Sequence, residues 1–291
     1  MGTFKIGKFK KRKIKIGKLL VYICMLILVA FTSLPLIAMI NRAFMPLEEL
    51  YLYPPRIFVK NPTFQNFSEL FTALNASVIP FTRYVFNSLI TTLATVFLTI
   101  LVCSMGAFAL VKYKPDGSKA IFSFILMALM FSSHVTQIPN YMVINKLGLI
   151  NSYWSLIIPK IAVAYNFFLM KQFSEQIPDA LLEAARIDGT NEFQLFWKIA
   201  MPLLRPAWST LAVFSFVSNW NDYFSPLIYI SRQAMQTLPI ALQTLSGGAG
   251  VVARTGAVAA ATFVTTLPTI IVFTIMKGRV MKTMAHSGIK A

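Results

Sequence analysis

Six long apolar runs constrain the fold of this 291-residue chain more than any other feature of its sequence. An α-helix rises about 1.5 Å per residue, so about 20 consecutive apolar residues cross a hydrocarbon core of about 30 Å. The chain is 56% hydrophobic and only 13% charged, which is too apolar for an ordinary soluble domain. We therefore predict an all-α, polytopic membrane protein with six transmembrane helices. The predicted spans are Leu19–Ile40, Tyr84–Val111, Ala120–Ile144, Tyr153–Lys171, Ala207–Ile230 and Ala253–Met276.

The basic residues gather at a few places, and this uneven distribution predicts how the chain is oriented. The formal net charge is +17, and eight of the 27 Lys and Arg residues lie before residue 19. Others crowd the short loop 112–119 and the C-terminal tail, whereas the stretches 145–152 and 231–252 carry one each. Because cytoplasmic loops carry an excess of Lys and Arg, both termini are expected on the cytoplasmic side of a bacterial-type cell membrane. The basic N-terminal tail is interpreted as a topology signal beside the lipid bilayer, and no nucleic acid is expected as a partner.

The chain divides into a basic N-terminal tail (1–18), a six-span domain (19–276) and a C-terminal tail (277–291). A carboxylate-rich loop, 173–206, lies within the six-span domain and is expected in the cytoplasm. The connection 41–83 is long and rich in proline and aromatic residues, and is expected to form a compact cap on the outer face. This cap either covers the ends of the spans or contacts a partner, and the sequence favours neither.

Several classes of site are absent from the sequence. Cys24 and Cys103 are the only cysteines and both lie within apolar runs, so no disulfide framework, metal site or cofactor is expected. The Gly-rich stretch 246–250 lacks the Gly-Lys-Ser/Thr ending that places a lysine on phosphates, and it is expected to be a flexible outer loop. Two histidines, one of them His286 near the C-terminus, do not form a convergent catalytic site. We expect a protein that is not an enzyme and has no catalytic residues.

The loop between the fourth and fifth runs is unusually acidic for this chain. The stretch 175–192 holds five of the ten Asp and Glu residues, so it must face water. A soluble partner protein is expected to bind it. Pro178 and Asp179 are typical of a helix start, with the Asp179 carboxylate capping free amides. Gly189 is typical of a left-handed helix stop. The pattern predicts a short first helix that ends at this glycine.

A second short helix is predicted after the glycine. Thr190 and Asn191 are candidate caps, and Pro202 ends or bends the helix. Small residues before the glycine would let another protein's backbone approach closely, and Glu183 is expected to bond backbone amides at the corner. The alternative is an amphipathic hairpin at the membrane interface that only links two spans. The residues by themselves leave both interpretations open.

The loop carries Glu183-Ala184-Ala185, then Asp188-Gly189, and then Ile199, Pro202 and Pro206. This pattern resembles the cytoplasmic "EAA" loop of the permease subunits of ATP-binding-cassette (ABC) importers. The Asp-Gly pair after Ala-Ala-Arg-Ile is similar to the carbohydrate branch, specifically to the smaller permease of maltose-type importers. Weaker matches are Asn87-Ser88, Leu147-Gly148-Leu149-Ile150-Asn151, Trp220-Asn221-Asp222 and the ending 287–291.

The resemblance implies a non-catalytic subunit that translocates a sugar or oligosaccharide by alternating access. It implies a heterodimer with a second permease, two cytoplasmic ATPase subunits that hydrolyse ATP, and an extracytoplasmic sugar-binding protein. The residues implied to couple the loop to an ATPase are Glu183, Ala184, Ala185, Asp188, Gly189, Phe193 and Pro202. The family's tail also reaches the ATPases, which implies a contact through Ser287, Gly288, Ile289 and Lys290.

Ionisable side chains inside apolar runs are costly and usually face a partner or a cavity. Lys160 in the fourth run and Asp222 in the fifth are expected to pair or to share one polar network, in the middle-to-outer half of the membrane. An ion pair that only fixes helix packing is the favoured interpretation, and a translocation pathway is the other. The pathway candidates beside the pair are Asn219, Trp220, Asn221 and Tyr223. They are candidates because amides and aromatic faces suit sugar hydroxyls and rings.

The third run departs from the family pattern, since the stretch 132–137 is more polar than the usual apolar segment. His134 within it is either a lumen-facing contact for the substrate or a histidine bonded to a neighbouring helix, and we favour the second interpretation.

Other functions remain as alternatives to sugar import. The first is an ABC importer permease for another solute. An ion-coupled secondary transporter would need several intramembrane carboxylates and an internal duplication, and only Asp222 qualifies. A membrane-embedded enzyme is the third alternative, and it lacks a convergent set of reactive side chains.

Overall fold

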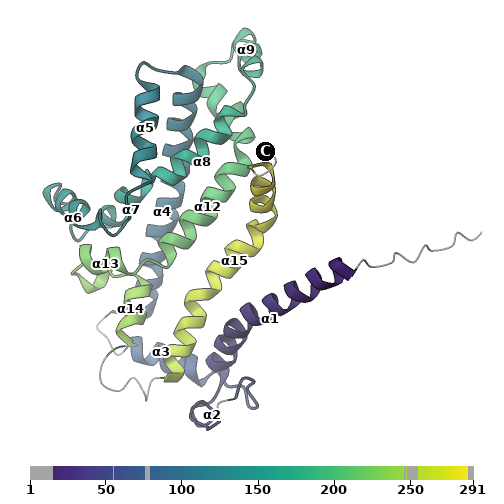
Figure 1. Ribbon diagram of the computed structural model, residues 1–291. Coiled ribbons are helices and arrows are strands. Elements are labelled where there is room, and N and C mark those ends of the chain that lie inside the picture. The colour runs from purple at the N-terminus through teal and green to yellow at the C-terminus, as the bar shows by residue number, and fades with distance from the viewer. Residues whose placement is uncertain (1–15, 55, 76–78, 246, 248–254, 288–291) are drawn as a thin grey trace, which may run out of the picture.

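The computed structural model describes residues 16–54, 56–75, 79–245, 247 and 255–287. All regular secondary structure in these ranges is helical, as the sequence predicts (Figure 1). The elements from the N-terminus to the loop 112–119 are α1 (Ile16–Phe44), α2 (Leu47–Leu50), α3 (Gln65–Asn75), α4 (Phe81–Phe108) and the π-helical turn η1 (Ala109–Tyr113). The next are α5 (Ser118–Ala128), α6 (Gln137–Lys146), α7 (Tyr153–Ile161), α8 (Ala164–Glu175), α9 (Asp179–Ile187), α10 (Glu192–Gln194), the π-helical η2 (Leu195–Ala200) and α11 (Met201–Leu203). The last are α12 (Arg205–Trp220), α13 (Phe224–Tyr229), the short 3-10 helix η3 (Gln233–Met235), α14 (Leu238–Leu245) and α15 (Thr255–Ser287).

Three helices are long and apolar enough to cross a membrane, and they correspond to the first, second and sixth predicted runs. They are α1, α4 continued by η1, and α15. Two bent pairs raise the number to as many as five: α7 with α8, bent by 44°, and α10–α11 with α12, bent by 75°. Within the described residues, length and composition therefore support three to five spans, and the count of six stays a prediction.

The prediction of one continuous helix over the third run, 120–144, is wrong. Helix α5 ends at Ala128 and α6 begins at Gln137, with turns in between. In this interval the Thr136 hydroxyl donates to the backbone carbonyl of Ser133 at 3.0 Å, and the His134 amide lies 3.4 Å from a serine hydroxyl. Such local bonds between side chain and backbone compete with the helical ladder. The polar stretch therefore interrupts the helix.

The fifth run, 207–230, is also broken, toward its C-terminal end. Helix α12 ends at Trp220, and α13 begins at Phe224. The Oδ1 atom of Asp222 accepts hydrogen bonds from the backbone amides of Phe224 and Ser225, at 3.0 and 3.2 Å. A carboxylate that satisfies free amides at a helix start favours a new helix at that point. The same side chain therefore bends the chain and faces the fourth run.

Helix α4 lies at the centre of the fold and packs against α7, α8 and α12. One buried apolar cluster joins α4, α8, the loop after α8 and the start of α12, and includes Phe108, Met170 and Leu211. A second cluster lies between α4, α12, α14 and α15, around Trp220 and Leu238. Helix α15 also packs along α1 and α3. Dispersion and burial of these apolar side chains hold the spans in fixed positions around α4.

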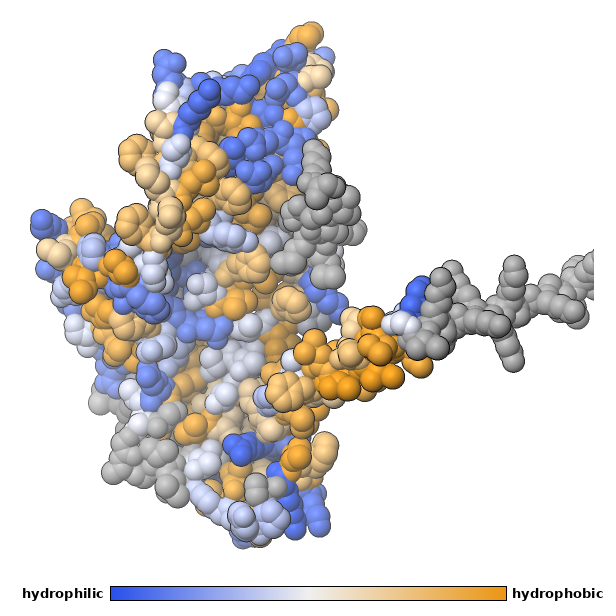
Figure 2. Space-filling view, in the orientation of Figure 1, coloured by the Kyte–Doolittle hydropathy of each residue, from blue (hydrophilic) through white to orange (hydrophobic). Residues whose placement is uncertain are grey.

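Helix α1 is the exception, because it leaves the body of the molecule. None of its most apolar 18-residue window is buried inside the chain. Figure 2 shows it as a hydrophobic arm that projects away from the other helices. A helix that is apolar on all sides and unburied is typical of a membrane span that faces lipid or another subunit.

Within its described residues, the connection 41–83 folds back on the end of α1, and its predicted place on the outer face stays a prediction. Asn66, 2% exposed, donates to backbone carbonyls at the C-terminal end of α1 at 2.8 and 3.0 Å, which closes that helix. The buried Glu49 accepts from the amides of Lys60 and Asn61. In Figure 1 this cap and α14 lie at one end of the molecule, and α9 lies at the other. The acidic loop and the cap therefore occupy opposite ends.

Candidate functional site: an acidic loop and a polar cavity

The acidic loop has the predicted form of two short helices joined at a glycine corner. Helix α9 ends at Ile187, and Gly189 follows with a φ of +82°, in the left-handed region. The side chain of Asn191 accepts a hydrogen bond from the Gln194 amide at 2.8 Å, so it caps the second helix as predicted. The corner glycine is required because an L-residue with a Cβ is strained at this φ.

Two details of the predicted loop are wrong. Asp179 does not cap α9, and its Oδ1 atom instead pairs with Lys112 Nζ at 2.7 Å. Glu183 was expected to bond amides at the corner, but it is exposed and makes no such bond in the described structure. Of the two small residues before the glycine, Ala185 packs inward and only Ala184 is exposed.

Two residues of η1, which continues α4, hold both arms of the loop. Lys112, with a side chain only 6% exposed, donates to Asp179 and to the backbone carbonyl of Ile177. The hydroxyl of Tyr113 donates to Glu192, which also accepts from Arg186. We call this set of contacts the loop latch. It ties the start of α9 and the start of α10 to the end of the same span.

The latch changes the acidity of Asp179. The hydrogen bond from Lys112, together with the charge of that ammonium, holds the pKa of the Asp179 carboxyl below its usual value. The side chain of Asp179 is 67% exposed, so water screens the attraction between the two charges. The latch therefore orients the loop more than it stabilises the fold.

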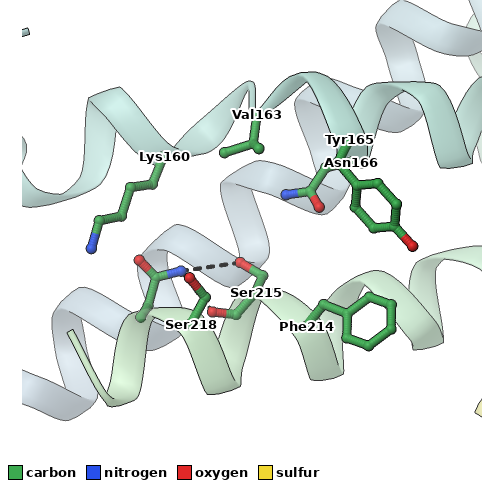
Figure 3. A pocket seen from close by; sticks show the side chains of 8 residues that line it. Lys160, Val163, Tyr165, Asn166, Phe214, Ser215 and Ser218 are labelled. Atoms are coloured by element: carbon green, nitrogen blue, oxygen red, sulfur yellow. Dashed lines mark hydrogen bonds between the residues drawn. The ribbon is translucent and has the colours of Figure 1, made fainter. Parts of the chain in front are cut away.

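A polar cavity opens between the fourth and fifth runs, with two adjoining lobes of about 740 and 420 Å³. The lobes share Lys160, Val163, Tyr165 and Ser218. Figure 3 shows the smaller lobe, where side chains from α7 and α8 face side chains from α12 across the hollow. Helices α5, α6 and α13 contribute further residues to the larger lobe. The volume is that of a typical small-molecule site.

The predicted contact between Lys160 and Asp222 is present. Nζ of Lys160 donates to Oδ2 of Asp222, and the two side chains are 22% and 16% exposed. Both residues line the larger lobe. The ion pair joins the two runs and also faces the cavity, and its part in a translocation pathway stays a prediction.

The cavity exists because the fourth run is broken beside Lys160. Helix α7 ends at Ile161, and the residues before α8 are not helical, which frees two carbonyl groups. The hydroxyl of Thr99 donates to the carbonyl of Lys160 at 3.3 Å, and the thiol of Cys103 lies 3.6 Å from the carbonyl of Ile161. Side chains of a neighbouring helix thus satisfy the freed groups, as a broken membrane helix requires.

The other predicted pathway residues fall into three places. Asn219 lines the smaller lobe, but its amide is bonded to the Ser215 carbonyl of its own helix at 2.6 Å. Trp220 is 3% exposed and donates to the carbonyl of Thr265 in α15, so it packs the core and does not face the cavity. Asn221 and Tyr223 line a separate hollow of about 300 Å³ against α14 and α15.

His134 lines the larger lobe together with Lys160 and Asp222. Its Nδ1 lies 3.4 Å from Nε2 of Gln137, three residues further along the same segment. Gln137 is the first residue of α6, so the contact joins the turn before α6 to that helix, and the choice between a packing role and a substrate contact stays a prediction. Of the predicted tail contact, Gly288, Ile289 and Lys290 lie outside the described residues, and Ser287 is the last residue of α15.

A model of one protein family matches residues 93–282, which is most of the chain and includes both the loop and the cavity. The family is described as the binding-protein-dependent transport system inner membrane component. The chain belongs to this family. Its members are non-catalytic permease subunits of ABC importers, so this inner membrane component is a multi-pass membrane protein and not an enzyme.

Curated relatives and a solved structure agree with this assignment. The inner membrane component is 32% identical to Protein LplC of Bacillus subtilis (strain 168) over 217 residues, which cover 75% of this chain and 71% of LplC. It is 31% identical to the arabinooligosaccharides transport system permease protein AraQ of Halalkalibacterium halodurans, over 75% of this chain and 77% of AraQ. It shares its fold with a chain of a bacterial ABC transporter involved in the import of the acidic polysaccharide alginate. The TM-score is 0.79 at 21% identity, covering 94% of this chain and 99% of that one.

The inner membrane component has functional positions that the sequence reasoning missed. A buried, mostly polar stripe runs along α4, and its last two members, Thr99 and Cys103, contact the freed carbonyls of the fourth run. The members are spaced four residues apart and are Asn87, Thr91, Thr95, Thr99 and Cys103. This spacing was a readable signal, because residues four apart share one face of a helix. The cavity residues Tyr165, Asn166 and Ser218 gave no such signal, since they lie on two helices that only packing brings together.

Proposed function

We propose that this chain is one transmembrane permease subunit of an ATP-driven carbohydrate importer, and that residues 178–202 couple it to a cytoplasmic ATPase. The observation that carries the coupling role is the exposed apolar face of the acidic loop. Ile187 and Phe193 are 87% and 71% exposed at the end of the molecule opposite the cap. Large apolar side chains on a loop that is latched in place fit a docking surface for another protein.

The cargo is inferred from the relatives. AraQ is named as a permease for arabinooligosaccharides, and the structural neighbour belongs to an importer of alginate. Both cargoes are saccharides, so we infer that this chain carries a sugar or an oligosaccharide. The complete importer would contain a second permease, two ATPase subunits and an extracytoplasmic sugar-binding protein, with both termini of this chain in the cytoplasm. The tail residues Ser287, Gly288, Ile289 and Lys290 would add a second contact with the ATPases.

The mechanism follows from the loop latch. Closure of the ATPases on ATP would move α9 at the docking surface. Because Lys112 and Tyr113 hold both arms of the loop, α9 and α10 would move together with the end of α4. Helix α4 packs against α7, α8 and α12, which enclose the polar cavity. Movement of the loop would therefore reach the cavity walls and alternate its access between the two sides.

The corner glycine provides the first test. Gly189→Val places a β-branched side chain at a φ of +82° and should distort the corner, which reduces transport at least tenfold. Gly117→Val is the matched control, because Gly117 has the same φ of +82° and open space around it but lies in the turn before α5. ATPase co-purification and uptake of saccharide in cells are the measurements. Wild-type transport by Gly189→Val would refute the coupling role.

The exposed face of the loop provides a second test. Phe193→Ala removes an apolar side chain that we place against the ATPase, and such an anchor contributes about 1–3 kcal/mol to binding. Co-purification of the ATPase with this variant should fall about tenfold or more, without loss of folded permease. Phe58→Ala is the control, because Phe58 is 68% exposed but belongs to the cap at the other end. Equal retention of the ATPase by both variants would place the docking surface elsewhere.

A further inference from the structure

The polar cavity is electrically balanced. Among the described residues that line its two lobes, Lys160 is the only Lys or Arg and Asp222 is the only Asp or Glu. The ammonium of Lys160 and the carboxylate of Asp222 form an ion pair with each other. Asp222 is engaged at both oxygens, because Oδ1 also accepts the backbone amides of Phe224 and Ser225. The carboxylate is fixed in place, and Lys160 cannot turn to a ligand without uncovering a charge.

The other polar lining groups are hydroxyls, amides and the His134 imidazole, and they lie among aromatic and aliphatic side chains. Asn166 is only 7% exposed, yet its side-chain amide has no hydrogen bond within the described part of the chain. Figure 3 shows that this amide points into the smaller lobe, toward Ser215 and Ser218 of α12. An amide that faces the lobe offers two donors and an acceptor to a ligand there. Together with Tyr165 beside it, this arrangement matches a ligand rich in hydroxyl groups.

We propose that the polar cavity is a subsite for a neutral saccharide, and that Asp222 is a specificity-determining residue that excludes carboxylated sugars. The proposal rests on the proposed carbohydrate import and narrows its substrate class by charge. A sugar carboxylate reaches Lys160 only by approaching the Asp222 carboxylate as well. In a partly enclosed site, repulsion between two carboxylates and the loss of their hydration disfavour the acidic sugar. A neutral sugar ring is neither repelled by Asp222 nor forced to lose the hydration of a charge. The cavity therefore selects neutral sugars by disfavouring acidic ones.

The experiment uses two disaccharides that differ only in charge. Galactobiose and digalacturonate share one ring skeleton, with a hydroxymethyl group or a carboxylate at C6. Equilibrium binding is measured on the purified importer, comprising both permeases and the ATPases, without the external binding protein so that it cannot select the sugar first. The wild-type importer should bind galactobiose at least tenfold more tightly than digalacturonate.

The decisive variant adds a cation and keeps the ion pair. Ser218→Lys places an ammonium in the part of the cavity that both lobes share, because Ser218 is exposed there. It should tighten digalacturonate binding about tenfold relative to wild type, since a charge-assisted bond becomes available. Ser218→Gln is the matched control, with similar length and no charge, and it should keep the preference for galactobiose. An unchanged preference in Ser218→Lys would overturn the proposal.

Two conservative variants of the pair test the role of Asp222 itself. Asp222→Asn leaves Lys160 unpaired and should shift the preference toward digalacturonate, whereas Lys160→Gln leaves the carboxylate and should weaken digalacturonate further. Shifts in the same direction for both variants would refute the proposal, as would a wild-type importer that binds neither disaccharide or prefers digalacturonate. These failures differ from a failure of the proposed function. In that case the permease would not co-purify with an ATPase, whichever sugar it binds.

Discussion

Two Lys–Asp pairs in the described part of the chain link one span to the start of another helix, and their surroundings differ. In the cavity, Lys160 and Asp222 are 22% and 16% exposed, so both charges have left most of their water. In the loop latch, Lys112 is 6% exposed but Asp179 is 67% exposed. The enclosed pair is costly to break, because the remaining charge keeps no adequate solvation. The latch pair is weaker, because water already surrounds its carboxylate.

Because their exposure to water differs, the two Lys–Asp pairs have different roles. The cavity pair bridges two broken runs where water is scarce, so it contributes to the fold and also sets the charge that a ligand meets. The latch pair sits at the boundary between span and loop, where it restricts the direction of α9. The comparison predicts that the two pairs respond very differently to the loss of one partner.

The largest effect is expected from Asp222→Ala. This change leaves the Lys160 ammonium without its partner and removes the cap of α13. We expect a loss of about 3 kcal/mol in the free energy of unfolding and at least a tenfold fall in transport. Denaturant unfolding of the purified protein and uptake in cells are the measurements. The charge-swapped double variant Lys160→Asp/Asp222→Lys should recover part of the stability, and no recovery at all would contradict the role of the pair in packing.

An intermediate effect is expected from Lys112→Met. The variant keeps an apolar stem of similar length but loses the hydrogen bond to the carbonyl of Ile177 and the pair with Asp179. A lost bond from a charged donor to this carbonyl costs about 1–2 kcal/mol. Amide hydrogen exchange across 177–190 should become about tenfold faster. Lys119→Met in α5 is the control, because Lys119 is exposed, and equal exchange in both variants would mean that the latch does not hold the loop.

The smallest effect is expected from Asp179→Asn and from acid. The pKa of Asp179 is lowered in the folded protein, so its pairing stabilises α9 above the unfolded pKa of about 3.9. That contribution is lost as the pH falls through the lowered folded pKa, and salt should weaken it. Relative to the intrinsic exchange rate at each pH, hydrogen exchange of α9 in the wild type should therefore rise toward that of Asp179→Asn as the pH drops below about 4. A wild type that exchanges like the variant at neutral pH would show that the ion pair contributes nothing.

Much of the loop was predictable because it depends on local chemistry. Gly189 is needed wherever a helix must stop in the left-handed region, and Asn191 is a strong cap wherever a helix begins. The partner of Asp179 was not predicted, because the local sequence allows its carboxylate either to cap α9 or to pair with a lysine. Lys112, 67 residues earlier in the chain, decided between them once α4 and α8 had packed.

The spans were less predictable than their apolar composition suggested. The run 120–144 has the length of a span, but hydroxyl groups in 132–136 bond the local backbone and break it. Hydropathy averages over a window and so misses such a local competition. The aromatic side chain of Trp220 made it a pathway candidate, but it packs against α15. No local pattern in the sequence indicates which side of α12 faces the cavity.

By itself, the sequence determined that the chain enters a membrane, that an acidic hairpin with a glycine corner leaves it, and that Lys160 and Asp222 need partners. These conclusions follow from local rules, namely the cost of charge in an apolar medium and the backbone geometry of glycine. Tertiary structure alone decided which side chains face the polar cavity, which carboxylate closes the latch, and that Asn166 was left with an open amide. Those outcomes depend on how α4, α8 and α12 rotate against one another, and side-chain packing along their whole length sets that rotation.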